Sequence, residues 1–289
     1  MNVASPQPSP SRLAAFLDRH PRLVVLTGAG CSTESGIPDY RDREGEWKHA
    51  QPMSFRDFTG SRHARRRYWA RSAVGWRRIA DAEPNPGHRA LARLESAGRL
   101  DLLITQNVDG LHHKAGNRRV VDLHGRLDKV ECLDCKTGYR RAPFQDELRR
   151  QNPDWRHWQP GARSTRPDGD VDLGPVDYGA FNLPTCPRCG GDLKPGVVFF
   201  GEAVPRRRTE RSFAALTEAD ALLVVGSSLM VWSGYRFARE AHRRGLPLAI
   251  LNLGRTRADG EATLKLEADC GELLPRAVDE LGLAAPTPG

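Results

Sequence analysis

The sequence predicts an α/β protein built on a doubly wound parallel sheet, with two inserted modules. The main observation is a set of five short apolar runs that each stop at a small or polar motif: 23–26, 102–104, 120–123, 222–225 and 248–251. Buried parallel strands read as such runs, and helix-like segments lie between several of them. Ligands bind beyond the carboxyl ends of such strands, so this pattern indicates an enzyme or a ligand-binding protein.

The first half of the chain begins with an amphipathic pattern at 12–20, which predicts a short helix before the first strand. Residues 54–80 carry several aromatic side chains without strand alternation and predict a small helical insertion. Asn85 and Pro86 then mark a helix start and Gly98 its end, directly before the second strand.

The second half begins with residues 126–195, which interrupt the α/β alternation and contain a loop-like stretch at 159–175. We expect a second inserted module there. The alternation then resumes and predicts helices and strands in turn at 206–218, 221–225, 233–244, 248–251 and 272–281.

Composition excludes several classes of protein. No apolar stretch approaches the ~20 residues that a membrane helix needs, and the start of the chain lacks the basic and apolar regions of a secretory signal. We therefore expect a cytoplasmic protein without a membrane partner. The formal charge of +8 is dispersed among acidic residues, which is typical of solvated helix faces and makes a nucleic-acid partner unlikely.

Four of the six cysteines form two C-x-x-C pairs separated by 50 residues: Cys132, Cys135, Cys186 and Cys189. Paired C-x-x-C motifs in a cytosolic chain favour a metal site over disulfides. Four thiolates suit tetrahedral zinc and leave no open position, so one structural zinc ion is predicted rather than a catalytic one.

A glycine loop, Gly28-Ala29-Gly30, follows the first strand. Glycines at this place let backbone N–H groups approach a pyrophosphate, although the same pattern occurs in a plain tight turn. Cys31 lies in this loop, but no base is identifiable beside it, so we assign it no catalytic role.

His124 ends a predicted strand and is followed by Gly125, which leaves room around the ring. A histidine there can take a proton from a hydroxyl group, or it can be structural. His112 and His113 compete for this role, but they lie in a predicted helix.

The motifs occur together in one order: 28–32, 36–41, 105–112, 123–125, the four cysteines, 197–202, 226–229 and Asn252. With them the sequence resembles the sirtuin family of NAD-dependent protein deacylases over residues 12–282. Tyr40, the segment 68–71 and the long spacer between the cysteine pairs resemble the class II branch of that family.

The resemblance implies a site for NAD and one structural zinc ion per chain. It assigns NAD contacts to Gly28, Ala29, Gly30, Ser32, Ile37, Asp39, Tyr40, Arg41, Gln106, Asn107, Val108, Asp109, Gly226, Ser227, Ser228, Asn252, Leu253, Gly254 and Cys270. It assigns the acyl-lysine protein substrate to Val198, Phe200, Gly201 and Glu202.

The resemblance also implies the chemistry. His124 acts as the base toward a ribose hydroxyl, with Asn107 as a second catalytic residue, and the products are free lysine, nicotinamide and O-acyl-ADP-ribose. A protein mono-ADP-ribosyltransferase, and a deacylase for longer or acidic acyl groups, are the alternatives within the family. A hydride-transferring dehydrogenase and a nucleic-acid module are the alternatives outside it. The protein target and the oligomeric state stay open.

The resemblance divides the chain into a discontinuous Rossmann-like NAD domain, formed by 12–41, 82–125 and 196–283. The smaller domain consists of a helical insertion at 42–81 and a zinc-ribbon insertion at 126–195. Flexible tails are expected at 1–11 and 284–289.

Overall fold

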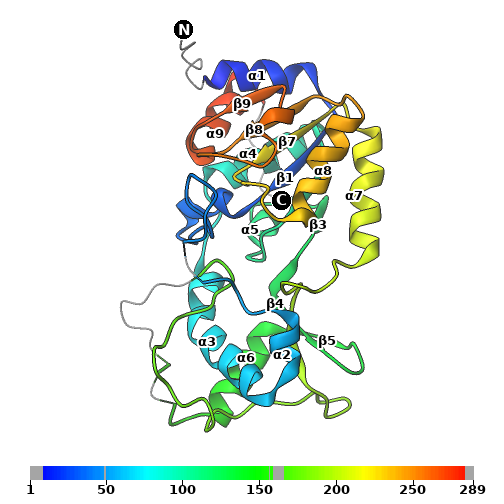
Figure 1. Ribbon diagram of the computed structural model, residues 1–289. Helices are drawn as coiled ribbons and strands as arrows, with labels where there is room; N and C mark the ends of the chain where they lie inside the picture. Colours follow the sequence, from blue (N-terminus) through cyan, green and yellow to red (C-terminus); the bar gives the residue numbers. More distant parts are fainter. Residues whose placement is uncertain (1–8, 49, 156, 159–165, 284–289) are drawn as a thin grey trace.

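The computed structural model describes residues 9–283 except 49, 156 and 159–165. The strands of this described part form a six-stranded parallel sheet and a separate three-stranded antiparallel sheet. The large sheet and its helices fill one end of the molecule, and α2, α3 and α6 lie at the other end, with β4 reaching toward them (Figure 1). The α/β class with a parallel sheet and a smaller second part is therefore confirmed.

The large sheet has the order β3-β2-β1-β7-β8-β9. Its strands are β1 (Leu23–Thr27), β2 (Leu100–Thr105), β3 (Val120–Asp122), β7 (Ala221–Val225), β8 (Leu248–Leu251) and β9 (Leu264–Leu266). The chain moves from β1 outward on one side and returns through β7 on the other, so the strand order reverses at β1. Ligands bind at such a switch point, outside the carboxyl ends of the strands.

Helices cover both faces of this sheet. The helices of the large part are α1 (Pro10–Arg19), α4 (Pro86–Ser96), α5 (Leu111–Lys114), α7 (Arg206–Glu218), α8 (Trp232–Arg243) and α9 (Cys270–Glu280). Because side chains alternate across a strand, Leu23 and Val25 pack with α1, α4 and α9, whereas Val24 and Leu26 pack with α7 and α8. Burial on both faces explains why β1 is apolar without alternation.

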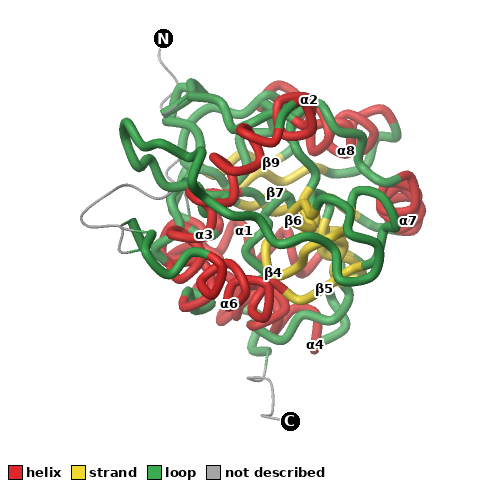
Figure 2. Tube along the Cα trace, turned by 90° about the horizontal axis from the view of Figure 1, so that it is seen from below, coloured by secondary structure: helices red, strands yellow, loops and turns green. Residues whose placement is uncertain are grey.

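The smaller part has its own core. Its strands are β4 (Gly125–Cys132), β5 (Gly138–Arg140) and β6 (Leu193–Val197), and its helices are α2 (Phe55–Gly60), α3 (Arg62–Asp81) and α6 (Arg141–Gln151). Seen from below, α6 lies beside the small sheet (Figure 2). A separate cluster of buried apolar side chains, including Trp69 and Phe181, joins these elements.

Arg141 is fully buried in that core. Its guanidinium lies 4.8 Å from the ring centre of Trp69 and 5.1 Å from that of Trp76, and it donates to Ser72 and Gln145. Burial lowers its pKa to about 10. Cation–π contacts with the aromatic rings and hydrogen bonds to neutral acceptors thus stabilise the buried guanidinium of Arg141.

The structure differs from the sequence prediction at several places. Strand β9, the small antiparallel sheet and α6 were not predicted individually, and α1 begins at Pro10, inside the segment expected to be a tail. Residues 1–8 and 284–289 of the expected tails lie outside the described residues. His124 follows β3 by two residues rather than ending it. The domain boundaries stay a prediction. In the part of the chain that the structure describes, no helix is long and apolar enough to cross a membrane.

Gly75 on α3 gives a test of how tightly the smaller part is packed. A methyl group there would lie 2.0 Å from the carbonyl oxygen of Gly169, so the loop at 166–172 would have to move. We expect Gly75→Ala to lower the free energy of unfolding by about 1–3 kcal/mol, measured by denaturant unfolding. Gly60→Ala is the control, because its methyl group would meet nothing within 4 Å. Equal losses in both variants would contradict this explanation.

Candidate active site

A cavity of about 600 Å³ lies at the carboxyl ends of the parallel strands and extends to the smaller part. Its volume falls within the range of cofactor sites, about 300–1,000 Å³. The cavity is lined by Gly28, Ala29, Gly30, Ser32, Ile37, Asp39, Tyr40, Arg41, Gln106, Asn107, Val108, Asp109, His124, Val198, Phe200, Gly201, Glu202, Gly226, Ser227, Ser228, Asn252 and Leu253, among others.

Two of the residues assigned to NAD lie outside this lining. Gly254 packs against Arg43, whose carbonyl oxygen would lie 2.3 Å from a methyl group at Gly254. Cys270 is buried at the start of α9, and its thiol donates to the Gly30 carbonyl at 3.3 Å. Both residues therefore support neighbouring loops rather than the cavity surface.

The structure gives a second reason for the glycines of this loop, and the approach of its backbone to a pyrophosphate stays a prediction. The N–H groups of Gly28 and Gly30 already donate to the carbonyls of Val225 and Gly226, so they are not free for a phosphate. A methyl group at Gly28 would lie 2.7 Å from Cβ of Ser227, and one at Gly226 would lie 2.3 Å from the backbone nitrogen of Cys31. These glycines let two loops approach each other at the floor of the cavity.

Asn107 and Asp109 hold this floor in place. The Asn107 amide donates to the Gly28 carbonyl and to the Ser32 hydroxyl, both at 3.0 Å. The Ser32 hydroxyl in turn donates to Asp109 at 2.8 Å, and the Leu111 N–H donates to the same carboxyl group. Burial raises the pKa of Asp109. The hydrogen bonds fix the shape of the glycine loop against the strand-end segment.

His124 is the titratable group best placed for proton transfer. Its Nδ1 lies 3.0 Å from the Gln106 carbonyl, which can only accept, so Nδ1 carries the hydrogen. Nε2 therefore holds the lone pair and accepts from the Ser233 hydroxyl at 2.7 Å. Burial lowers the pKa of His124 to about 4, opposed by the Gln106 carbonyl and assisted by Arg208 and Arg236. The ring is neutral at neutral pH and can act as a base.

The competing histidines do not line the cavity. His112 is buried against Thr27 at 2.9 Å, and His113 pairs with Asp122 at 2.9 Å. Their side chains support the strand-end segments, which leaves His124 as the candidate base.

Aromatic side chains form one wall of the cavity. The rings of Tyr40 and Phe200 each contact Trp47, with ring centres 6.0 Å and 5.8 Å apart. Arg41, which the resemblance assigns to NAD, also lines the cavity; its guanidinium lies 4.0 Å from the Trp47 ring centre and donates to the Gly45 carbonyl at 2.7 Å. The wall therefore presents apolar surface that excludes water.

The far end of the cavity was missed by the sequence analysis. Arg71 there binds Asp170 through two hydrogen bonds, at 2.6 and 2.9 Å, and Arg166 shares the same carboxylate at 3.2 Å. Burial raises the pKa of Asp168 to about 6. This end of the cavity is thus polar and largely charge-balanced. The loop that forms it has no hydrophobic periodicity, so nothing in its sequence pointed to the cavity.

Glu202 lines the cavity, but its carboxylate already has partners. It accepts from Lys194 at 3.0 Å and from the Phe199 N–H at 2.9 Å. The neighbouring Val198 N–H donates to the His124 carbonyl at 2.7 Å. The carboxylate therefore shapes the 197–202 segment, which lies directly beside the candidate base.

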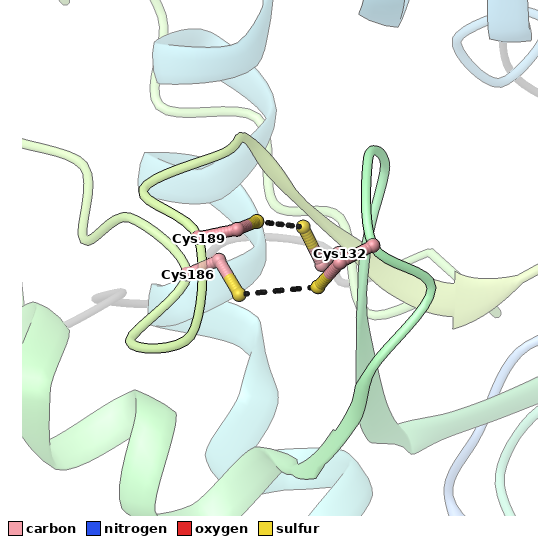
Figure 3. A group of neighbouring side chains, drawn as sticks. Cys132, Cys186 and Cys189 are labelled. Atoms are coloured by element: carbon pink, nitrogen blue, oxygen red, sulfur yellow. Dashed lines mark hydrogen bonds between the residues drawn. The ribbon is translucent and has the colours of Figure 1, made fainter.

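The four cysteines of the C-x-x-C pairs come together in the smaller part. Sulfur atoms lie 3.5 Å apart for Cys132 and Cys189 and 3.7 Å apart for Cys135 and Cys186 (Figure 3). All four lie within 4.8 Å of one another. Zinc–sulfur bonds of about 2.3 Å in a tetrahedron place sulfurs about 3.8 Å apart, so the group fits one zinc ion.

The fold and cavity define a class: an α/β enzyme with a nucleotide-type cavity at its strand ends, a half-buried neutral imidazole and a four-thiolate metal site. The model of the Sir2 family matches residues 28–233. The chain belongs to the Sir2 family.

Relatives and solved structures agree with this assignment. The "NAD-dependent protein deacetylase" of Bordetella bronchiseptica is 57% identical over 266 residues, covering 92% of this chain and 96% of the relative. The "NAD-dependent protein deacylase SRT2" of Arabidopsis thaliana is 44% identical, covering 95% and 77%. The structure described as "Sir2-p53 peptide-NAD+" has a TM-score of 0.74 and 29% identity, covering 94% of this chain and 98% of that one.

The metal site gives a direct test. We expect Cys186→Ser to leave one zinc ion fewer per chain than in the parent protein and to loosen the smaller part, because metal binding contributes folding free energy. Metal analysis after gel filtration, together with tryptophan fluorescence, measures both effects. Cys270→Ser is the control, since that thiol lies outside the four-cysteine group. A full zinc content in Cys186→Ser would contradict the assignment.

Proposed function

We propose that this member of the Sir2 family is an NAD-dependent protein-lysine deacylase that releases nicotinamide and O-acyl-ADP-ribose. The observation that carries the proposal is His124, a half-buried neutral imidazole that lines the cavity together with the glycine loop. The named activities of its relatives and the NAD and peptide in the solved Sir2 complex support it.

The side chains around His124 suit a proton transfer. NAD, when bound, supplies the ribose–nicotinamide bond that is cleaved and the ribose hydroxyl that loses its proton. His124 takes this proton on Nε2, while Nδ1–H stays on the Gln106 carbonyl in a hydrogen bond that strengthens when the ring becomes cationic. The aromatic wall of Tyr40, Trp47 and Phe200 keeps water from the reacting centre. Asn107 keeps the glycine loop fixed during this step.

We infer that the protein substrate is an acyl-lysine segment that binds beside 197–202. Solved Sir2 structures are described as bound to an acetylated peptide and to a propionylated peptide. In this chain Val198, Phe200 and Gly201 line the cavity together with His124, which supports a peptide site at this segment. The charged residues Arg71 and Asp168, which also line the cavity, support the alternative of a deacylase for longer or acidic acyl groups.

We also propose the domain division inferred from the sequence, with 12–41, 82–125 and 196–283 forming the NAD domain. The separate core of the smaller part supports it. A cytoplasmic location and the absence of a nucleic-acid partner stay predictions.

A product assay tests the reaction class. We expect mass spectrometry of the protein with NAD and a panel of acyl-lysine peptides to detect acyl-ADP-ribose, free lysine peptide and nicotinamide. His124→Ala should lower kcat/KM by at least about 100-fold because the base is lost. The control is His242→Ala, an exposed histidine of α8. An ADP-ribose adduct on protein without deacylated peptide, or reduced nicotinamide, would reject the proposal.

Ser233 gives a finer test of how His124 is held. The hydroxyl of Ser233 lies 2.7 Å from Nε2, and a hydrogen bond of this kind contributes about 0.5–1.5 kcal/mol. We expect Ser233→Ala to lower kcat by about 2- to 10-fold without raising KM for NAD, since the imidazole loses its orientation but the NAD contacts persist. Ser233→Thr, which keeps the hydroxyl, should stay close to the parent. Equal defects in the two variants, or a rise in KM alone, would contradict a positioning role.

A further inference from the structure

Three metal-ligating side chains meet beneath the glycine loop, outside the cavity lining. They are Cys31 at the end of η1 (Ala29–Cys31), His88 on α4 and His112 on α5. One ligand atom from each lies within 4.8 Å of the others. The three residues are 1%, 0% and 2% exposed, so bulk solvent does not reach them.

His112 presents an unused ring nitrogen. The Thr27 hydroxyl donates to Thr105 at 2.9 Å, so it accepts from His112 Nε2, which lies 2.9 Å away and carries the hydrogen. Nδ1 then holds a lone pair, and it has no hydrogen-bond partner within the described residues. A buried acceptor without a donor costs free energy.

His88 also has a ring nitrogen whose lone pair is free, but other contacts determine which nitrogen it is. The Asn85 amide nitrogen donates to the Cys31 carbonyl at 2.8 Å, which turns the amide oxygen toward His88 Nδ1, also at 2.8 Å. Nδ1 therefore carries the hydrogen, and the longer 3.4 Å contact from the Asn85 N–H is secondary. His88 Nε2 is left with the lone pair.

The nearest hydroxyl does not satisfy His88 Nε2. Ser32 lies 3.5 Å away, but its hydrogen is donated to Asp109 at 2.8 Å. The remaining donor in the group is the thiol of Cys31, which also interacts with Cys270 and has one hydrogen, too few for two imidazole lone pairs. At least one buried acceptor in the group thus has no donor.

We propose that Cys31, His88 and His112 form a second metal site, suited to Zn²⁺ and separate from the four-cysteine site. Zinc accepts both imidazole lone pairs and a thiolate at once, a ligand set that is common for this ion. On binding, the Cys31 sulfur forms a bond to zinc and its proton is released to water. The thiolate then neutralises one of the two positive charges of the ion. In both histidines the other ring nitrogen carries the hydrogen and donates it to an acceptor, Thr27 for His112 and Asn85 for His88, as in metal-ligating histidines.

Occupation of this site would act on the cavity above it. Cys31 belongs to the glycine loop, and Ser32, its neighbour, lines the cavity and binds Asn107 and Asp109. A metal bond to Cys31 pulls on this loop, so we expect zinc to inhibit the enzyme. This inhibitory consequence rests on the proposed function, whereas the metal binding itself does not.

Metal stoichiometry tests the site without reference to activity. The full-length, zinc-loaded protein is kept reduced, incubated with excess Zn²⁺, separated by gel filtration and analysed for metal. We expect two zinc ions per chain in the parent, one in Cys31→Ser and one in His112→Gln. His113→Gln is the matched control for His112→Gln: this neighbouring histidine pairs with Asp122 and lies outside the three-residue group, so the variant should keep two.

Co²⁺ added to the zinc-loaded protein gives an independent readout, because thiolate ligation produces a charge-transfer band. The band should form in the parent and in His113→Gln and be absent in Cys31→Ser. One zinc ion in the parent, or a band that persists in Cys31→Ser, would overturn the proposal. Zinc should also slow deacylation by the parent at least ten-fold more than by Cys31→Ser. Absence of deacylation in every form would count against the proposed function, and the stoichiometry would still decide on the metal site.

Discussion

The close approach of two loops at the carboxyl ends of β1 and β7 is the constraint on which the rest of the site depends. Gly28 and Gly226 leave no room for a side chain between them, and the Gly30 N–H donates to the Gly226 carbonyl at 2.9 Å. Parallel pairing of β1 with β7 places both loops at the same edge of the sheet. The cavity floor is therefore a product of backbone packing, and any β-carbon there would separate the two loops.

Gln106 connects the two loops to the candidate base, His124, through hydrogen bonds. Its side-chain amide donates to the Ser227 hydroxyl at 2.7 Å, which links the end of β2 to the loop after β7. Its backbone carbonyl accepts from His124, and its side chain packs against Gly234 in the first turn of α8, where a methyl group would lie 2.4 Å away. One residue thus fixes the strand ends, the imidazole and the start of the helix that carries Ser233.

The elements that could be predicted from the sequence are those whose pattern lies within a few neighbouring residues. The strands at 221–225 and 248–251 agree with the structure because each is a continuous apolar run with a clear stop, and the helix at 206–218 directly precedes the first of them. The cysteine pairs were recognisable by spacing, and the predicted convergence of their sulfurs is confirmed. Strand β9 has three residues, too few to show a period. The far end of the cavity depends on a contact between Arg71 and Asp170, which are 99 positions apart in the chain, and no local pattern carries that information.

Burial sets the charge of this cavity more than any single ion pair does. It lowers the pKa of His124, assisted by Arg208 and Arg236, and it raises the pKa of Asp109 and Asp168. Arg71 and Arg166, the cations at the far end, share the carboxylate of Asp170. The wall near His124 thus presents a neutral base and aromatic rings. A base with a lowered pKa is intrinsically weaker, but it stays unprotonated at neutral pH and adds no positive charge beside a reacting sugar that itself becomes cationic. Desolvation of His124 therefore lowers its basicity but also keeps the ring uncharged, so that it does not repel positive charge that develops on the sugar.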